Sequence, residues 1–133
     1  MASVTLKNLT KQFNSGSPAL RELSLEVRDG EVLVLLGPTG CGKTTTLRCI
    51  AGLEEPTDGQ ILIGDRDVTQ LSPGDRDVAM VFQNYSLYPH LTVRDNIGFP
   101  LALRRIARGD RARRMEAAAE RLGLTGLLDR RPG

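Results

Sequence analysis

The sequence lacks long apolar runs and has few cysteines. No stretch approaches the roughly 18 unbroken apolar residues of a membrane-spanning helix, so no span is expected. Residues 1–7 also lack the charged and then apolar pattern of a secretory signal, which favours a cytosolic protein. The two cysteines, Cys41 and Cys49, are too few for a disulfide scaffold. Cys41 directly precedes one predicted helix and Cys49 lies within it, about 12 Å further along, so we expect two free thiols.

Charge is nearly balanced in total but unevenly distributed. The formal net charge is +2, yet nine arginines stand against four acids between Arg104 and Arg131. Such a tract could bind nucleic acid or an anionic membrane surface. Because acids are interspersed, we favour a solvated helical face and expect no nucleic-acid partner. With 40% apolar and 26% charged residues, the composition is that of an ordinary globular domain.

Strand patterns occupy the first part of the chain. Residues 4–7 and 23–27 alternate apolar and polar side chains, which predicts strands with one solvated face. Residues 31–36 and 78–82 are almost wholly apolar, which predicts two strands buried on both faces of a parallel sheet. Residues 60–63 predict a further short strand.

Helical patterns are interleaved with these strands and dominate the end of the chain. A helix is expected over residues 42–51, with Gly52 as its stop. Thr92 followed three residues later by Asp95 has the form of a capping box and predicts a helix start. Another helix fits residues 110–122, with Gly123 as its terminator. Its apolar stripe consists of Met115, Ala118, Ala119 and Leu122. Together these patterns predict an α/β core with an added β layer and a helical annex.

A phosphate-binding loop lies between the first apolar strand and the first helix. The motif G-x-x-x-x-G-K-[ST] is matched at every position, by Gly37, Pro38, Thr39, Gly40, Cys41, Gly42, Lys43 and Thr44, with Thr45 following. Backbone N–H groups of such a loop surround a β-phosphate, and the positive helix N-terminus faces the phosphates. Lys43 is expected to reach the β- and γ-phosphates, and Thr44 to offer its hydroxyl to Mg²⁺. The strand–loop–helix context makes nucleotide binding the firmest functional prediction.

Gln83 follows the predicted strand over residues 78–82. Ligands bind at the carboxyl ends of strands in open α/β sheets, so an amide there could ligate Mg²⁺ or orient water. Taken alone, a glutamine at this place is more often an ordinary loop residue. The sequence has no Asn-Lys-x-Asp motif for reading guanine, which disfavours a GTPase.

The sequence resembles the ATPase subunits of ABC transporters, closely those that energise carbohydrate importers. The resemblance covers essentially the whole chain. It rests on the phosphate loop and on the tracts Ile50-Ala51-Gly52-Leu53-Glu54, Asp75-Arg76-Asp77-Val78-Ala79-Met80-Val81-Phe82-Gln83-Asn84-Tyr85 and Ser86-Leu87-Tyr88-Pro89-His90-Leu91-Thr92-Val93. It implies a partial P-loop NTPase fold: an antiparallel β layer plus P-loop core over residues 1–89, then the start of a helical subdomain over residues 90–133.

The resemblance also implies roles for single residues. Lys43 and Gln83 would be catalytic, and Thr44 and Gln83 would hold the Mg²⁺ of bound ATP. Phe13 falls where the family places an aromatic that stacks on adenine, although Tyr or Trp is commoner there. His90 is not the family's switch histidine, and Cys41 is a routine occupant of the loop.

The partners that the resemblance implies are other transporter subunits. Permease subunits would contact residues 83–91, where four apolar side chains either line that surface or pack internally: Tyr85, Leu87, Tyr88 and Leu91. A second ATPase subunit would complete a homodimer that sandwiches ATP. The protein would then sit peripherally on the cytoplasmic face of the inner membrane.

The 133 residues contain no Leu-Ser-Gly-Gly-Gln signature, no Walker B aspartate with its catalytic glutamate and no switch histidine. We therefore expect this chain by itself to show no hydrolysis above background. It should also be poorly soluble, because the sheet order that the resemblance implies would leave the strand over residues 32–36 with unpaired edges and exposed apolar faces. The leading interpretation is the energising subunit of a sugar or sugar-phosphate importer. Alternatives are an importer of polyamine, iron or another small solute, a soluble ABC protein acting on DNA or ribosomes, and a non-hydrolytic nucleotide-binding remnant.

Overall fold

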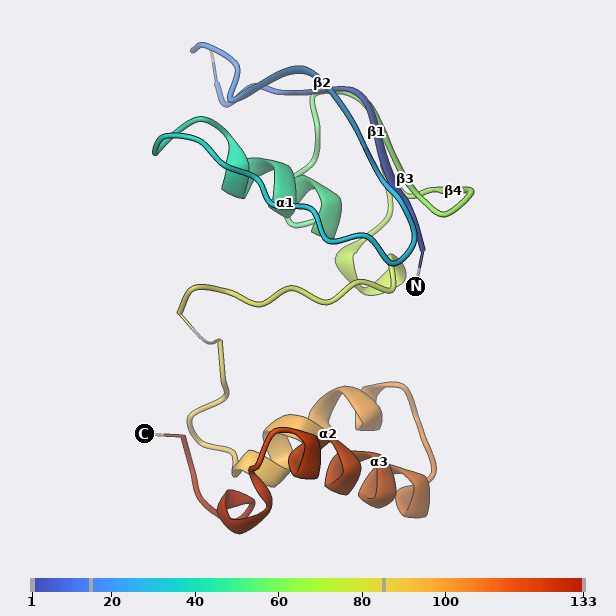
Figure 1. The fold of residues 1–133 in the computed structure, drawn as a ribbon, viewed down its shortest axis with the longest axis vertical. Helices are drawn as coiled ribbons and strands as arrows, with labels where there is room; N and C mark the ends of the chain where they lie inside the picture. The colour runs from blue at the N-terminus through green and yellow to red at the C-terminus, as the bar shows by residue number, and fades with distance from the viewer. Residues whose placement is uncertain (1, 15, 85, 133) are drawn as a thin grey trace. The chain divides into compact units, whose positions relative to one another are not determined.

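The computed structural model describes residues 2–14, 16–84 and 86–132 (Figure 1). They form two compact units, Met1–Met80 and Val81–Gly133. The first unit holds a β layer and one α-helix, and the second is helical. Among the described residues, no helix combines the length and the apolar character that crossing a bilayer requires.

A four-stranded antiparallel sheet forms one layer of the first unit. Its strands are β1 (Val4–Lys11), β2 (Leu20–Val27), β3 (Asp58–Ile63) and β4 (Arg66–Asp67), in the order β2-β1-β3-β4. This confirms the expected antiparallel β layer. Leu6 lies opposite Leu25 on one side and Ile61 on the other, so three apolar side chains form a row across the sheet.

A bulge in β1 explains how its two most deeply buried leucines share a face. Leu6 and Leu9 are three positions apart, which would place them on opposite faces of a regular strand. The register shifts between them, and Asn8 has a φ of 49°, so the strand turns locally and both leucines reach the core. Both side chains are fully buried.

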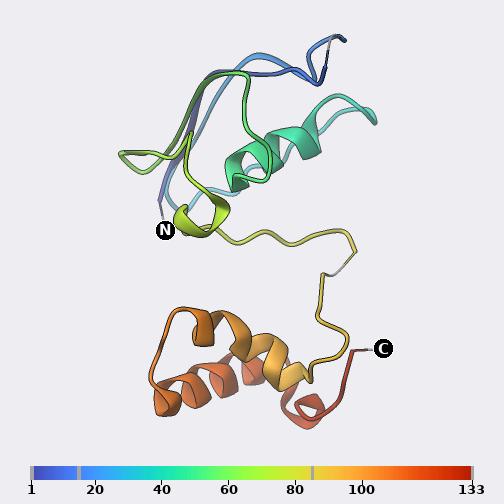
Figure 2. The same ribbon diagram turned by 180° about the vertical axis from the view of Figure 1, so that it is seen from behind.

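Helix α1 (Lys43–Ala51) packs against this sheet (Figures 1 and 2). Cys49 enters a core cluster with Leu6, Leu9, Leu20, Ile61 and Val68. The helix ends at Gly52 as predicted, with a φ of 77°. The N–H of Gly52 donates to the Cys49 carbonyl and that of Leu53 to the Arg48 carbonyl, which is the hydrogen bonding of a Schellman motif.

A buried arginine links the end of α1 to the segment after β4. Arg76 follows the short 3₁₀ helix η1 (Pro73–Asp75), and 3% of its surface is exposed. Its guanidinium donates to four backbone carbonyl oxygens, those of Cys49 at 2.7 Å, Leu71 at 2.9 Å, Thr69 at 3.0 Å and Ile50 at 3.1 Å. Burial lowers the pKa of Arg76. Nothing in the sequence patterns indicated this role.

The two apolar strands predicted at residues 31–36 and 78–82 do not form. Within the described residues neither segment pairs with a strand, and the sheet of the first unit contains only β1 to β4. Val32 and Leu36 are each 88% exposed, and Val81 is 93% exposed. A strand exists only by hydrogen bonding to a neighbour, so an apolar sequence without an adjacent strand stays irregular. These predictions were therefore wrong for this structure.

The second unit is a pair of helices with a small core of its own. Its elements are α2 (Val93–Leu103), α3 (Arg108–Arg121) and the 3₁₀ helix η2 (Thr125–Leu127). Thr92 caps α2 as predicted, since its Oγ1 accepts from the Asp95 N–H at 3.1 Å and lies 2.7 Å from Asp95 Oδ2. Met115, Ala119 and Leu128 form the core, against which Val93, Ile97, Leu101 and Leu124 pack.

The predicted apolar stripe of α3 needs one correction. Met115 and Ala119 are buried, but Leu122 is 68% exposed. The helix ends at Arg121, and Gly123, with a φ of 66°, reverses the chain. The N–H of Leu124 then donates to the Ala119 carbonyl at 2.8 Å, and Leu124 packs on the core in place of Leu122.

Candidate nucleotide-binding site

The loop before α1 has a backbone that only glycine fits at two places. Gly42 has a φ of 96°, and a Cβ there would lie 2.6 Å from the Ala19 carbonyl oxygen and 2.7 Å from Leu20 Cδ2. A Cβ on Gly37 would lie 2.7 Å from Cys41 Sγ. A side chain at either position would force the loop open, so the glycines keep a narrow backbone cradle.

The N-terminus of α1 is open toward this cradle. Gly42 is the N-cap and supplies no side-chain hydrogen bond, and the first turn contains no acid. The backbone N–H groups of that turn have no intrahelical partners and carry the positive end of the helix dipole. Thr44 lies exposed in the same turn. This arrangement is suited to an anion such as phosphate.

The side chain of Lys43 folds back onto the loop that precedes it. Its Nζ donates to the carbonyl oxygens of Gly37 at 2.7 Å and Pro38 at 2.8 Å, and lies 3.6 Å from Cys41 Sγ. The ammonium is thus held by neutral carbonyls. Hydrogen bonds to charged oxygens are roughly twice as strong, so phosphate oxygens can replace these partners.

Phe13 lies in the same unit as the loop. Figures 1 and 2 both show the segment between β1 and β2 on the same side of the first unit as the loop before α1. The close approach of Gly42 to Ala19 joins these two segments directly. The Phe13 ring is 46% exposed, and Lys11 Nζ lies 4.8 Å from its centroid. Its stacking on adenine stays a prediction.

The segment that follows Gln83 belongs to the second unit. Gln83, Leu87 and Tyr88 are exposed and Leu91 is half-buried, whereas Tyr85 lies outside the described residues. Tyr88 contacts Phe99 at 4.9 Å between ring centroids. The exposed apolar side chains are available to a partner, but the roles of Gln83 and of this segment stay predictions.

Asn96 holds this segment in shape, which the sequence patterns did not indicate. Its Oδ1 accepts from the Tyr88 N–H at 2.9 Å, and its Nδ2 donates to the carbonyls of Tyr88, Leu91 and Thr92 at 3.1, 3.3 and 2.9 Å. One amide side chain on α2 thereby fixes both ends of the turn over residues 88–92. The sequence signal for this role would have been an asparagine four residues after the N-cap Thr92, one turn into the helix.

The donor set around the loop suits Mg²⁺ only together with phosphate. Among the described residues no group of three or more His, Cys, Asp or Glu side chains could hold a metal. Mg²⁺ bound with a nucleotide commonly takes one or two protein ligands and otherwise phosphate oxygens and water. The Thr44 hydroxyl is a ligand of that kind.

The two cysteines are free, as predicted, and differ sharply in environment. Cys41 is exposed in the loop, whereas Cys49 is fully buried and its burial raises the pKa of the thiol. Because the thiolate is the reactive species, iodoacetamide should alkylate Cys41 at least about 100-fold faster than Cys49. Mass spectrometry of the two peptides from the full-length protein measures both rates. In denaturant the rates should converge, and equal rates in native protein would contradict the burial of Cys49.

Comparisons with known proteins agree with this geometry. A family model described as ABC transporter matches residues 20–133. The chain belongs to the ABC transporter family. A dimeric structure of the ATP-binding cassette MJ0796 in a post-hydrolysis state, bound to ADP and Pi, is similar with a TM-score of 0.83 at 29% identity, covering 97% of this chain and 61% of that one. The partial ABC ATPase fold predicted from the sequence is therefore confirmed.

Curated relatives of this ABC chain are ATP-binding subunits of importers. It is 57% identical to the trehalose/maltose import ATP-binding protein MalK of Thermococcus litoralis and 53% identical to the sn-glycerol-3-phosphate import ATP-binding protein UgpC of Ruegeria pomeroyi. It is 52% identical to the diacetylchitobiose uptake system ATP-binding protein MsiK of Streptomyces coelicolor. Each match covers 99% of this chain but only 35–37% of the relative, so the chain spans about a third of their length.

Proposed function

We propose that the chain is the phosphate-binding part of an ATPase subunit that energises an ABC importer of sugars or sugar phosphates. The observation that carries the proposal is the Lys43 ammonium, bonded to two loop carbonyls beside the open N-terminus of α1. The names of the relatives support the solute class, since they refer to trehalose, maltose, glycerol phosphate and diacetylchitobiose.

The loop residues would hold the phosphates of ATP. Backbone N–H groups over residues 39–45 would surround the β-phosphate, and Lys43 would exchange its carbonyl partners for β- and γ-phosphate oxygens. The Thr44 hydroxyl would be one ligand of the Mg²⁺ that neutralises charge on those oxygens when bound, and the role of Gln83 as a further ligand stays a prediction. Through its contacts with the β- and γ-phosphate oxygens, the Lys43 ammonium would also stabilise the negative charge that develops as the γ-phosphoryl group leaves.

Hydrolysis and coupling would depend on the full-length protein and its partners. A second ATPase subunit would close over the nucleotide, and MJ0796, which is similar to this chain, has a dimeric structure bound to ADP and Pi. Permease subunits would dock on residues 83–91, where Leu87 and Tyr88 are exposed. The complex would place the ATPase on the cytoplasmic face of the inner membrane.

Reconstitution of the full-length protein with its permease and binding protein tests the solute class. ATP hydrolysis should be stimulated by a disaccharide such as trehalose or maltose, or by glycerol 3-phosphate. Stimulation by spermidine or ferric iron, with none by any carbohydrate, would replace the proposed solute while leaving the ATPase assignment intact.

Phe13 should contribute to ATP affinity through stacking on the base. Stacking of a nucleobase on an aromatic ring contributes about 1–3 kcal/mol, so Phe13→Ala should weaken MgATP binding by roughly fivefold or more. Isothermal titration of the full-length protein measures the change. Phe13→Trp, which keeps a stacking surface, should bind at least as tightly as the parent. A loss of less than about threefold in Phe13→Ala would count against stacking.

A further inference from the structure

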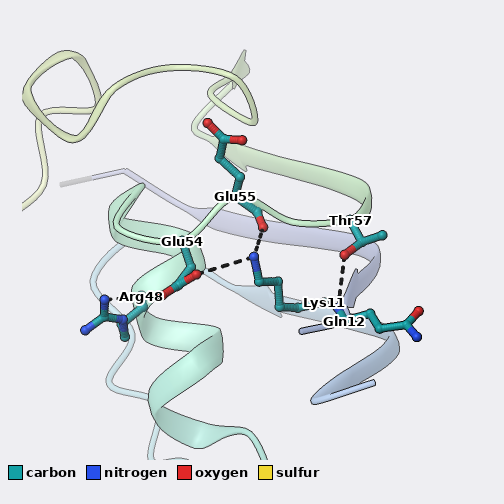
Figure 3. Close-up of polar contacts among 6 residues, drawn as sticks. All are labelled: Lys11, Gln12, Arg48, Glu54, Glu55 and Thr57. Atoms are coloured by element: carbon teal, nitrogen blue, oxygen red, sulfur yellow. Dashed lines mark hydrogen bonds and ion pairs between the residues drawn. The ribbon is translucent and has the colours of Figure 1, made fainter. Parts of the chain in front are cut away.

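The ammonium of Lys11 lies over the ring of Phe13 and is held by the segment that follows α1. Figure 3 shows Lys11 with Glu54 and Glu55 of that segment. Its Nζ donates to the Glu55 carbonyl at 2.7 Å and pairs with Glu54 Oε2 at 3.3 Å. Only 14% of the Lys11 side chain is exposed, which is unusual for a lysine at a strand end. The same ammonium lies 4.8 Å from the Phe13 ring centroid, within the range of a cation–π contact.

The backbone next to Lys11 is tied to the segment that supplies these partners. The N–H of Gln12 donates to Thr57 Oγ1 at 3.0 Å, and the N–H of Thr57 donates to the Thr10 carbonyl at 2.7 Å. The side-chain Nε2 of Gln12 also donates to the Gly16 carbonyl at 2.8 Å. The backbone that leads to Phe13 is therefore tied to Thr57, and the Gln12 side chain links it to Gly16.

The ring of Phe13 has no polar group with which to fix its own orientation. A tyrosine hydroxyl or a tryptophan N–H could be hydrogen-bonded, but a phenyl ring is held only through its faces and edges. Lys11 occupies one face, and the 46% exposure of Phe13 leaves ring surface accessible on the rest of it. Among the described residues, Lys11 is the cation found over this ring.

We propose that Lys11 is a positioning residue for the nucleotide base. Its ammonium, anchored by Glu54 and the Glu55 carbonyl, holds the Phe13 ring so that the opposite face receives adenine. This inference rests on the proposed stacking of Phe13 and adds the residue that orients the ring. It predicts an effect specific to the base, because Lys11 has no part in holding the phosphates.

The test compares MgATP with magnesium tripolyphosphate, which lacks the base, on the full-length protein. Lys11→Met, which keeps the apolar stem, should raise the Kd for MgATP about threefold to fivefold, the range of a cation–π contact. The Kd for tripolyphosphate, measured by competition, should stay within twofold of the parent. Lys11→Arg, which can keep a cation over the ring, should bind MgATP within twofold of the parent.

Arg48 provides the matched control. It pairs with the other carboxylate oxygen, Glu54 Oε1, at 3.3 Å, and comes from α1 (Figure 3). Arg48→Met therefore removes an ion pair from the same glutamate without removing the cation over Phe13. MgATP affinity should be unchanged within twofold, and a loss equal to that of Lys11→Met would overturn the proposal.

A double mutant separates this inference from the stacking on which it rests. Lys11→Met combined with Phe13→Ala should bind MgATP no more weakly than Phe13→Ala alone, because the cation then has no ring to orient. If Phe13→Ala weakens MgATP binding but Lys11→Met does not, positioning by Lys11 is wrong and stacking stands. If Phe13→Ala has no effect, stacking itself fails. Equal losses for ATP and tripolyphosphate in Lys11→Met would show a purely structural role and also overturn the proposal.

Discussion

Replacing Lys43 with alanine should lower the affinity of the full-length protein for MgATP by at least about 100-fold. Lys43 Nζ now bonds to the carbonyls of Gly37 and Pro38, which shows that the ammonium reaches the interior of the loop. Each hydrogen bond from a cation to phosphate contributes about 1.5–3 kcal/mol, so the loss of two accounts for such a change. Isothermal titration calorimetry with ATP and with tripolyphosphate measures it.

The control for Lys43 is another lysine of the same unit. Lys7 is exposed on β1, where it pairs with Gln60 of β3, and Lys7→Ala should leave both affinities unchanged. Both ligands should lose affinity in Lys43→Ala, in contrast to the base-specific effect expected of Lys11→Met. If Lys43→Ala binds MgATP within threefold of the parent while remaining folded, the loop would not be the phosphate site.

Features set by neighbouring residues were predictable from the sequence. The start of α1 beside Gly42, its end at Gly52 and the Thr92 cap all depend on residues within a few positions of one another. Glycine dihedrals and capping hydrogen bonds are local, so a motif of eight or fewer residues contains the information that determines them.

Features that depend on distant residues were not predictable in this way. Residues 31–36 have the composition of a buried strand, but strand formation needs a neighbour that composition does not identify. The anchoring of Lys11 depends on Glu54, which lies far along the chain and reaches it only through the packing of α1 on the sheet. Leu122 had the right spacing for the stripe of α3, yet the reversal at Gly123 gave its place to Leu124.

Arg76 also depends on residues distant in the sequence, and we expect its replacement to lower the stability of α1 substantially. Its carbonyl partners include Cys49 and Ile50 in the last turn of α1, where the helix dipole is negative. Burial of the guanidinium opposes its charge and lowers its pKa, so a well-packed apolar replacement recovers some desolvation energy. The Cys49 carbonyl keeps its bond from the Gly52 N–H, but the desolvation gain does not satisfy the carbonyls of Ile50, Thr69 and Leu71. A buried polar group without a partner costs about 1–3 kcal/mol. The loss of the bonds therefore outweighs the gain.

Arg76→Met should accordingly destabilise α1 by about 3 kcal/mol, the cost of leaving several carbonyls without donors. Hydrogen exchange of α1 amides, followed by mass spectrometry of the full-length protein, should become about 100-fold faster. Arg66 offers a matched control, because this exposed arginine donates to the Asp75 carbonyl at 3.2 Å, its one acceptor in the part of the chain that the structure describes. Arg66→Met should change α1 exchange by less than about threefold, since exposed contacts contribute little to stability. If the two substitutions had equal effects, the buried guanidinium would not be what holds the end of α1 in place.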